Sequence, residues 1–392
     1  MPRRPPAASP AAADPELAQQ LAARFPRAAI AHEWLTIPGG SEAVVEAILG
    51  LLPDAELFTT VHDPAPWGPP IAGRPVHPSF LQRIPGATRQ YPKLLPLMDA
   101  AFRRFDLGGY DLVVSSSHAN AKNVRTREAV PRPLHVCYCH TPMRYAWDPG
   151  FLEGEQLGRV GRGVFRAVLP RLRRADLRGA EQVDAFVANS TVVAARIRRH
   201  YGRDATVVHP PVAVDRFLGV PRTAAADAPY LFFGRVVPYK RADAAVAACE
   251  RLGRRLVVAG EGRDLERVRA LAGPNTTFAG RVSDAELTAL LASSRALLFP
   301  GEEDFGIVPV EAQAAGLPVV GLGTGGVRDS VRDGVTGVLY EDATVDGLVA
   351  AIERFEALAL DDAAIRDNAR RFGPQRFADE FARVLLTAER RA

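Results

Sequence analysis

The segment Glu303-Asp304-Phe305-Gly306-Ile307-Val308-Pro309-Val310-Glu311 places two glutamates eight positions apart. An apolar run at 296–299 precedes it, and an apolar helical pattern continues to Gly316. This order predicts a buried strand, a loop that carries Glu303, and a helix that begins at Gly306. The start of a helix presents unpaired backbone N–H groups and the positive end of the helix dipole, which together attract anions. The segment therefore predicts a site for a phosphate-bearing ligand with an acid on either side.

The alternative without a functional role is that Glu303 and Glu311 are solvated surface acids. Glu311, however, lies in a helix that is apolar nearly all round, and such a helix is normally buried. A carboxylate on a buried helix needs a partner, which favours a function for Glu311.

Short β-rich runs alternate with helical patterns along the whole chain, which is typical of α/β folds with parallel sheets. We expect two doubly wound Rossmann-like domains that face each other across a cleft and bind ligand at the carboxyl ends of their strands. The expected parts are a disordered Pro/Ala-rich tail at 1–25, an N-terminal Rossmann-like domain at 26–220, a linker at 221–229, a C-terminal Rossmann-like domain at 230–373, and a helix at 374–392 that packs back on the N-terminal domain.

The composition is that of a soluble globular protein, with 392 residues, 47% hydrophobic and 24% charged. No apolar run reaches the ~18 residues of a membrane span, and the N-terminus lacks the apolar core of a signal peptide. The three cysteines form neither a disulfide framework nor a zinc pattern, which favours the reducing cytoplasm. No basic-aromatic module for nucleic acid is present in the sequence.

A second candidate motif, residues 233–241, leaves a predicted strand and enters a helix. Arg235 offers a fork for phosphate oxygens, and Lys240 offers a point charge. Only three of the 49 basic residues are lysine, so a lysine at this position is notable. The alternative is ordinary surface charge at a helix start.

Two further motifs come from the first half of the chain. Gly39 and Gly40 lie between the first strand and the first helix, where backbone N–H groups can cradle a diphosphate, although a glycine pair before a helix is also common. His140 directly follows the buried strand at 134–138, at the edge where cleft chemistry occurs. A purely structural histidine is an equal alternative there.

Several motifs are absent or incomplete. The sequence has no Asp-x-Asp, so a carboxylate-held divalent metal has no obvious ligands and we expect none. Residues 321–326 match Gly-x-Gly-x-x-Gly, but the segment up to Gly334 is too short for the crossover helix of a dinucleotide fold. We therefore discount NAD.

The segment 159–178 holds seven arginines among apolar residues. It is either a solvated helix face or a basic amphipathic surface for peripheral contact with the inner face of an anionic membrane.

Taken together, these motifs resemble the retaining glycosyltransferases of family 4, over about residues 28–390. The motifs of the second half are the acid pair, Gly234-Arg235 with Lys240, Glu261-Gly262 and Gly280-Arg281-Val282. The first half, through 32–35, 115–118 and 140–148, is similar to a bacterial mannosyltransferase branch of polysaccharide assembly that uses GDP-mannose. Such relatives often carry Arg-Gly-Gly-Glu-Lys where this chain has Pro38-Gly39-Gly40-Ser41-Glu42, so only the glycine backbone remains for phosphate there.

The resemblance implies the GT-B fold, with 26–220 as the acceptor-side domain and 230–373 as the nucleotide-sugar-binding domain. It also implies roles for individual residues. Arg235 and Lys240 would neutralise the donor diphosphate, Glu303 would hold sugar hydroxyls, and His140 would line the reaction centre. Glu311 would bind the ribose. The remaining donor-binding residues implied are Gly39, Gly40, Gly260, Gly262, Val282, Phe305, Gly306, Ile307 and Val308.

The implied function is metal-independent transfer of a hexose, with mannose favoured, from a nucleotide diphosphate sugar to a glycan, glycolipid or small-molecule acceptor. Alternatives are a UDP-, ADP- or dTDP-sugar donor, a sugar-nucleotide epimerase or phosphorylase, a non-catalytic sugar-nucleotide-binding subunit, and a membrane scaffold.

Overall fold

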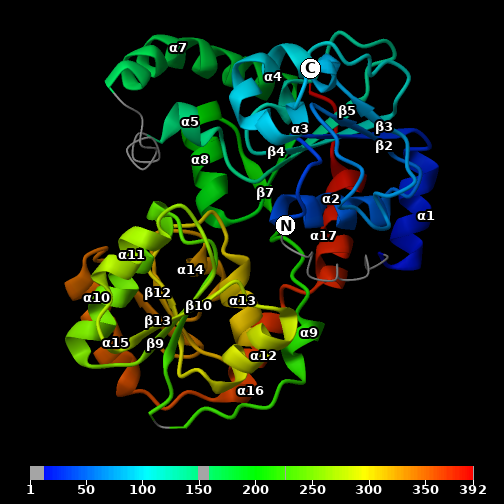
Figure 1. The fold of residues 1–392 in the computed structure, drawn as a ribbon. Coiled ribbons are helices and arrows are strands. Elements are labelled where there is room, and N and C mark those ends of the chain that lie inside the picture. The colour runs from blue at the N-terminus through cyan, green and yellow to red at the C-terminus, as the bar shows by residue number, and fades with distance from the viewer. Residues whose placement is uncertain (1–12, 149–158, 226, 392) are drawn as a thin grey trace. The chain divides into compact units, whose positions relative to one another are not determined.

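The computed structural model describes residues 13–148, 159–225 and 227–391 (Figure 1). The chain divides into two compact units. The first unit comprises Met1–Pro211 together with Pro374–Ala392, and the second comprises Val212–Gly373.

The first unit is built on a parallel sheet with the strand order β3-β2-β1-β4-β5-β6-β7. The order reverses between β1 and β4, so the chain leaves these two neighbouring strands in opposite directions. In this register His32 lies opposite Ser116. The carboxyl ends of β1 and β4 therefore form the switch point where ligands of such sheets bind. The strands are β1 (Ala28–His32), β2 (Glu56–Thr59), β3 (Val76–Pro78), β4 (Leu112–Ser117), β5 (Leu134–Cys139), β6 (Ala185–Ala188) and β7 (Ala205–Val207).

Helices cover both faces of this sheet. The core on one face packs β1, β4 and β5 against α1, α2 and α17, and the cores on the other face involve η3 and the end of α7. The helices are α1 (Pro15–Arg24), α2 (Gly40–Leu51), α3 (Ala87–Gln90), α4 (Leu95–Phe102), α5 (Arg144–Trp147), α7 (Arg159–Gln182), α8 (Thr191–Tyr201) and α17 (Pro374–Thr387), with 3₁₀ turns η1 (Phe80–Arg83), η2 (Tyr91–Leu94) and η3 (Ala121–Asn123).

The second unit repeats the doubly wound plan, with the parallel strand order β10-β9-β8-β11-β12-β13 and its reversal between β8 and β11. In Figure 1 its strands lie between α10 and α15 on one side and α12, α13 and α16 on the other. The strands are β8 (Tyr230–Phe233), β9 (Leu256–Ala259), β10 (Thr276–Gly280), β11 (Leu297–Phe299), β12 (Val319–Leu322) and β13 (Gly337–Tyr340). The helices are α9 (Asp215–Leu218), η4 (Pro238–Lys240), α10 (Ala242–Leu252), α11 (Leu265–Leu271), α12 (Asp284–Ser293), α13 (Ile307–Ala314), α14 (Val327–Ser330), α15 (Val345–Glu356) and α16 (Asp362–Arg370).

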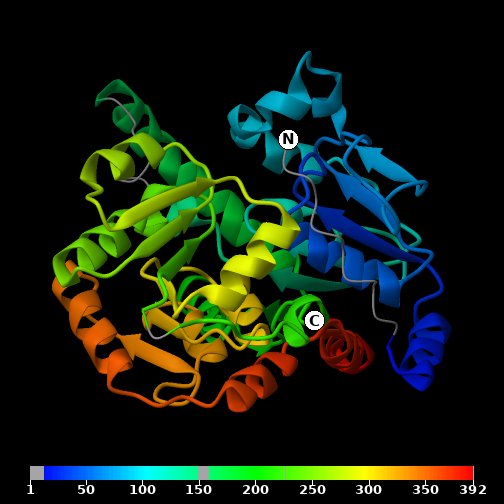
Figure 2. The same ribbon diagram turned by 60° about the horizontal axis from the view of Figure 1, so that its bottom comes forward.

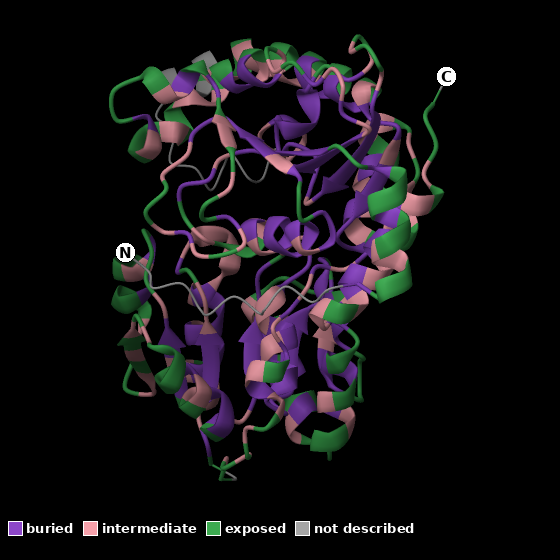
Figure 3. Cartoon of the chain, turned by 90° about the vertical axis from the view of Figure 1, so that its right-hand side faces the viewer, coloured by how far each residue is buried: buried purple, intermediate pink, exposed green. Residues whose placement is uncertain are grey.

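Burial follows from this layering. The central strands of both sheets are largely buried, the edge strands β3, β7 and β10 are partly exposed, and the outward faces of the helices are exposed (Figure 3). Near-continuous apolar strands are the expected result when helices cover both faces of a parallel sheet.

Two expected boundaries differ from the structure. Part of the expected disordered tail, Pro15–Arg24, is the helix α1, which begins with an Asp14 cap and a proline at its first turn and buries Leu21 in the core. The chain passes into the second unit at Val212, ahead of the expected linker at 221–229, because Val212 and Phe217 pack into the core of the second unit.

The helix α17 lies in the first unit, next to α2, and Figure 2 shows it almost end-on. Its Phe381 ring stacks on Phe377 at 5.5 Å between centroids and meets the edge of Tyr138 at 5.8 Å. This aromatic cluster fastens the last helix of the chain to the centre of the first sheet.

We expect Phe381→Ala to lower the free energy of unfolding by about 3–5 kcal/mol, because it removes a fully buried ring and leaves a cavity. Equilibrium urea unfolding measures this loss. Phe80→Ala is the matched control, since Phe80 is exposed and lies under Arg104, and it should cost no more than about 1 kcal/mol. Equal losses for the two variants would contradict this account of α17.

Candidate functional site

The switch point of the second unit brings together the two sequence motifs that carry cations and acids. The loop after β8 holds Lys240, and the loop after β11 holds Glu303. Lys240 Nζ lies 2.5 Å from Glu303 Oε1, and the two side chains are only 13% and 21% exposed. An ion pair with so little exposure is screened weakly by water. Arg235, on the same loop as Lys240, is exposed and contacts the Tyr239 hydroxyl at 3.4 Å.

The glycine-rich segment after β12 has a structural role that the sequence motif did not reveal. Gly326 N–H donates to Glu303 O at 2.8 Å. A Cβ added to Gly326 would lie 2.1 Å from Asp304 O, so only glycine permits this close approach. The helix that follows, α14, covers only Val327–Ser330, too short for a dinucleotide crossover. The segment therefore packs against the backbone of the loop that carries Glu303 and supports it.

The helix α13 begins where the sequence predicted. Gly306 is its N-cap in the left-handed region, with φ of 88°, and no side chain caps the first turn. The N–H groups at the start of α13, including those of Ile307 and Val308, are therefore without a side-chain cap, while Phe305 anchors the turn in the core. This is the helix start that the sequence indicated, and the binding of an anion there stays a prediction.

Glu311 lies in the second turn of α13 and is partly exposed. Burial raises the pKa of Glu311 to about 7, with the charge of Arg216 acting in the opposite direction and that of Asp284 adding to the rise. Arg216 itself pairs with Asp284 at 3.1 Å. Arg216 comes from α9, far away in the sequence, and no local pattern pointed to it.

The remaining donor-side residues lie in loops at the same edge of this sheet. Val236 N–H donates to Glu261 O at 2.9 Å, which holds the loop with Gly260 and Gly262 against the loop after β8. Val282 precedes the capping box of α12 and packs partly into the core. These contacts place the loops together, and their roles toward a ligand stay predictions.

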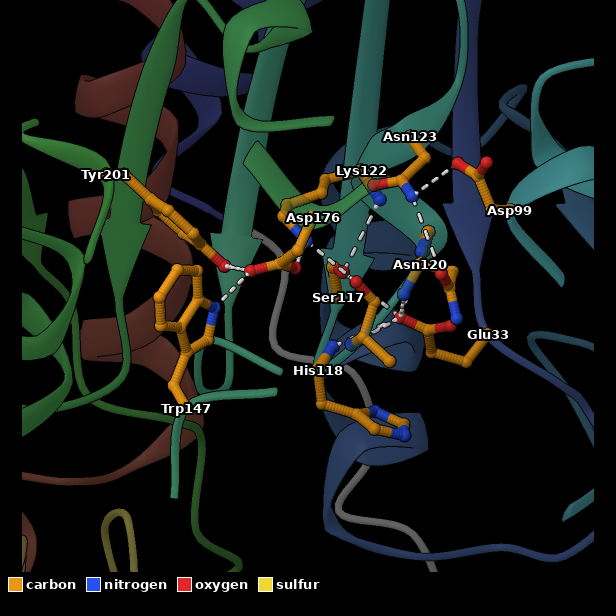
Figure 4. A network of polar contacts seen from close by, with 12 residues as sticks. Glu33, Asp99, Ser117, His118, Asn120, Lys122, Asn123, Trp147, Asp176 and Tyr201 are labelled. Atoms are coloured by element: carbon orange, nitrogen blue, oxygen red, sulfur yellow. Dashed lines mark hydrogen bonds and ion pairs between the residues drawn. The ribbon is translucent and has the colours of Figure 1, made fainter. Parts of the chain in front are cut away.

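In the first unit, a buried acid organises the loop after β4 (Figure 4). Glu33 follows β1, and its Oε1 accepts hydrogen bonds from the Ser117 hydroxyl and from four successive backbone N–H groups, those of residues 118–121, at 2.8–3.2 Å. Although burial opposes ionisation, the charge of His118 and the N–H donors hold the pKa of Glu33 below its usual value. The sequence motif contained Glu33, but this wrapping role depends on β1 and β4 being neighbours.

A second buried acid, Asp176 of α7, fastens three elements together (Figure 4). Its carboxylate lies 2.5 Å from Lys122 Nζ and accepts hydrogen bonds from Trp147 Nε1 at 2.6 Å and the Tyr201 hydroxyl at 2.9 Å. Lys122 and Asp176 are fully buried, so removing either would leave an uncompensated charge.

The arginine-rich segment 159–178 forms most of α7. Arg173 donates to Ala146 O at 2.9 Å, and Arg178 lies 3.6 Å from Asp99. The side chains of Arg159 and Arg162 lie outside the described residues. Some of these arginines therefore serve internal contacts, and the membrane contact stays a prediction.

His140 directly follows β5 and is tightly held. Its backbone N–H donates to Ser117 O at 2.8 Å, its carbonyl accepts from Asn189 Nδ2 at 3.0 Å, and its Nε2 lies 2.8 Å from Ser116 Oγ. Burial, together with the charges of His118 and His32, lowers the pKa of His140 well below its usual value, so the ring is neutral.

The Gly39-Gly40 pair lies at the start of α2, where Gly39 is the N-cap without a side-chain cap. Glu42 occupies the first turn of this helix and is buried, with Oε1 3.2 Å from His32 Nε2. The negative charge of Glu42 thus faces inward, and a phosphate role for the glycine backbone stays a prediction.

Two absences concern only the residues that the structure describes. Among them, no group of three or more His, Cys, Asp or Glu side chains could hold a metal ion. No helix within the same ranges is long and apolar enough to cross a membrane.

Both halves of the chain are similar to known protein families. Residues 38–216 match the model for Glycosyltransferase Family 4, and residues 222–372 match the model for Glycosyl transferases group 1. Both models describe glycosyltransferases, and together they cover most of the chain. The two matches fall on the two parallel-sheet units in turn.

The D-inositol 3-phosphate glycosyltransferase of Geodermatophilus obscurus is 34% identical over 255 residues, which cover 55% of this chain and 56% of that protein. The glycogen synthase of Mycobacterium tuberculosis is 35% identical over 190 residues, covering 43% and 44%. The chain thus spans about half the length of the curated relatives that it matches.

Solved structures show the same fold. The apo form of the lipopolysaccharide outer core galactosyltransferase WaaB has a TM-score of 0.66 at 17% identity, covering 92% of this chain and 99% of that one. Anabaena HepE in complex with UDP has a TM-score of 0.65 at 16% identity, with the same coverage. The expected fold class, with two Rossmann-like domains of GT-B type, is confirmed.

The raised pKa of Glu311 predicts a pH dependence of stability. Because the folded-state pKa of about 7 exceeds the ordinary value of 4.5, folding favours the protonated acid, and that contribution is lost as pH rises through 7. Relative to Glu311→Gln, the wild-type protein should lose about 2–3 kcal/mol of unfolding free energy between about pH 5 and 8. Urea unfolding at a series of pH values measures the difference.

Glu353→Gln provides the control, because Glu353 is exposed on α15. Its unfolding free energy should follow the wild-type pH profile. A Glu311→Gln profile parallel to the wild type would show that Glu311 is not the group responsible.

Proposed function

We propose that this protein is a retaining glycosyltransferase that moves a hexose from a nucleotide diphosphate sugar to an acceptor hydroxyl. The observation that carries the proposal is the Lys240–Glu303 ion pair at the switch point of the second sheet. The loop that carries Glu303 leads directly to the start of α13, which has no side-chain cap. A cation, an acid and a helix N-terminus are the groups that a sugar diphosphate needs.

The leaving diphosphate develops negative charge as the glycosidic bond breaks. Lys240, Arg235 and the N–H groups at the start of α13 stabilise that charge, so two cations and a helix dipole supply what a metal ion supplies elsewhere. Lys240 is already held by Glu303, which limits the reorganisation needed when the donor binds.

The acids bind the hydroxyls of the donor. Glu303 holds sugar hydroxyls, and Glu311 holds the hydroxyls of the ribose. The acceptor hydroxyl attacks the oxocarbenium-like sugar from the face that the diphosphate leaves, which retains the configuration, and a diphosphate oxygen takes the proton. A covalent intermediate on Glu303 is the alternative route.

The donor proposed is GDP-mannose, on the strength of the first-half motifs that resemble mannosyltransferases. A UDP-sugar is the alternative, and it is supported by the solved HepE complexes with UDP and UDP-glucose. The acceptor proposed is a glycan, a glycolipid or a small molecule.

A non-catalytic sugar-nucleotide-binding subunit is the rival from another functional class. It would bind donor without turnover across a panel of acceptors. The pairing of Lys240 with Glu303 favours the enzyme. A subunit that only binds the donor needs no acid beside the lysine that binds the diphosphate.

Lys240→Ala and Glu303→Ala should each lower kcat for sugar transfer by roughly 10²–10³-fold, the usual loss when one preorganised group for developing charge is removed. Release of nucleoside diphosphate during transfer measures turnover, and thermal melting checks that each variant is folded. Lys93→Ala is the control, because Lys93 is exposed on η2, and it should keep full turnover. Near-wild-type turnover by Lys240→Ala would refute the assignment.

A thermal-shift panel of GDP-, UDP-, ADP- and dTDP-sugars should single out the donor. A ligand at 100 times its Kd adds about 2.7 kcal/mol to stability, so GDP-mannose should raise the melting temperature and a non-donor should not. Lys240→Ala should reduce the shift. A shift with UDP-sugars alone would make the GDP-mannose assignment wrong, and no shift with any sugar nucleotide would contradict the proposed function.

A further inference from the structure

A chain of polar side chains runs from Glu42 of α2 to His140 on one face of the first sheet. Glu42 Oε1 lies 3.2 Å from His32 Nε2. His32 Nδ1 lies 3.1 Å from Ser116 Oγ, and Ser116 Oγ lies 2.8 Å from His140 Nε2. Glu42, His32 and Ser116 are buried, so water does not compete for these contacts.

The hydrogens on His32 follow from its partners. Nε2 faces the Glu42 carboxylate, and Nδ1 also lies 3.2 Å from the Ser116 carbonyl oxygen. A carboxylate and a carbonyl can only accept hydrogen bonds, so both ring nitrogens of His32 must donate. Burial opposes ionisation of Glu42, but the hydrogen bond and charge of His32 hold the pKa of Glu42 below its usual value. His32 thus links the Glu42 carboxylate to Ser116 through its two ring N–H groups.

The Ser116 hydroxyl links the two histidines. Its oxygen accepts from His32 Nδ1–H, and His140 Nε2 at 2.8 Å is the acceptor within reach of its own hydrogen. His140 Nε2 therefore accepts, and in a neutral ring the hydrogen lies on Nδ1.

We propose that Glu42, His32 and Ser116 are positioning residues that hold His140 as the neutral Nδ1–H tautomer. His140 can then donate from Nδ1 to a sugar or acceptor oxygen while its backbone stays fixed by Ser117 and Asn189. The proposal rests on the proposed function, because it assumes that His140 acts in sugar transfer.

The opposite ordering of hydrogens makes the proposal testable. If His32 Nδ1 were unprotonated, its lone pair would face the lone pairs of the Ser116 carbonyl at 3.2 Å, which is repulsive. Ser116 would then donate to His32, and His140 would carry its hydrogen on Nε2. The two orderings therefore predict opposite tautomers of the same ring.

NMR of the full chain with ¹⁵N-labelled histidine distinguishes them. The resonances of His140 are identified by their loss in His140→Gln, and their ¹H–¹⁵N correlations report the tautomer. We expect the Nδ1–H form in the wild type, a mixture of tautomers in Ser116→Ala, and the Nδ1–H form again in Ser116→Thr, which restores the hydroxyl. An Nε2–H form in the wild type, or an unchanged tautomer in Ser116→Ala, would overturn the proposal.

The chain offers a matched control on the neighbouring residue. Ser115 Oγ contacts His135 Nε2 at 2.9 Å, and both residues are buried. Ser115→Ala removes a comparable serine–histidine contact on the next residue of β4 and should leave the His140 tautomer unchanged. If Ser116→Ala does not fold, Glu42→Gln serves instead, because it removes the carboxylate that accepts from His32 Nε2 and should also mix the tautomers.

Kinetics tests the positioning role. Ser116→Ala should lower kcat by roughly tenfold, the scale of one hydrogen bond, with the donor KM unchanged, and Ser116→Thr should restore kcat. An unchanged kcat alongside a shifted tautomer would refute the positioning role. If the wild type transfers no sugar, only the proposed function is refuted, because the NMR experiment still determines the tautomer of His140.

Discussion

Both sites depend on one constraint, the pairing of two parallel strands from which the chain departs in opposite directions. Backbone hydrogen bonds hold β1 beside β4 and β8 beside β11, so the loops after each pair meet at the carboxyl edge. No helix crosses over that point, because each connection turns away from it. The Lys240–Glu303 pair in the second unit and the His32–Ser116 contact in the first unit both lie there.

Charge in these sites is neutralised by protein groups that are already in place. Glu33 is wrapped by backbone N–H groups, Asp176 by a lysine, an indole and a phenol, and Glu42 by His32. A buried charge is tolerated only when its partners are fixed. The same partners fix the loops that bear His118 and His140, so neutralising the charges also gives the site its shape.

The elements that could be predicted from sequence are those set by neighbouring residues. A helix beginning at Gly306, a loop acid at Glu303 and cations after the strand at 230–233 all depend on periodicity and on residue types within a few positions. The role of Gly326 behind the Glu303 loop, the place of Arg216 near Glu311 and the first helix α1 could not be predicted in this way. Each depends on contacts with residues far away in the sequence, as when α1 packs against α17 at the other end of the chain.

The sequence by itself determined a two-part α/β chain with an acid pair about a helix start, because strand and helix periods and local motifs are properties of short segments. Its motifs also resemble those of family 4 glycosyltransferases. Only the tertiary structure decided that Lys240 pairs with Glu303, that Glu33 organises the loop beside it, and that His32 and Glu42 reach His140 through Ser116. The physical reason is the order of the strands in each sheet. Neighbouring strands in a parallel sheet are chosen by packing across the whole sheet, and that choice decides which distant side chains meet.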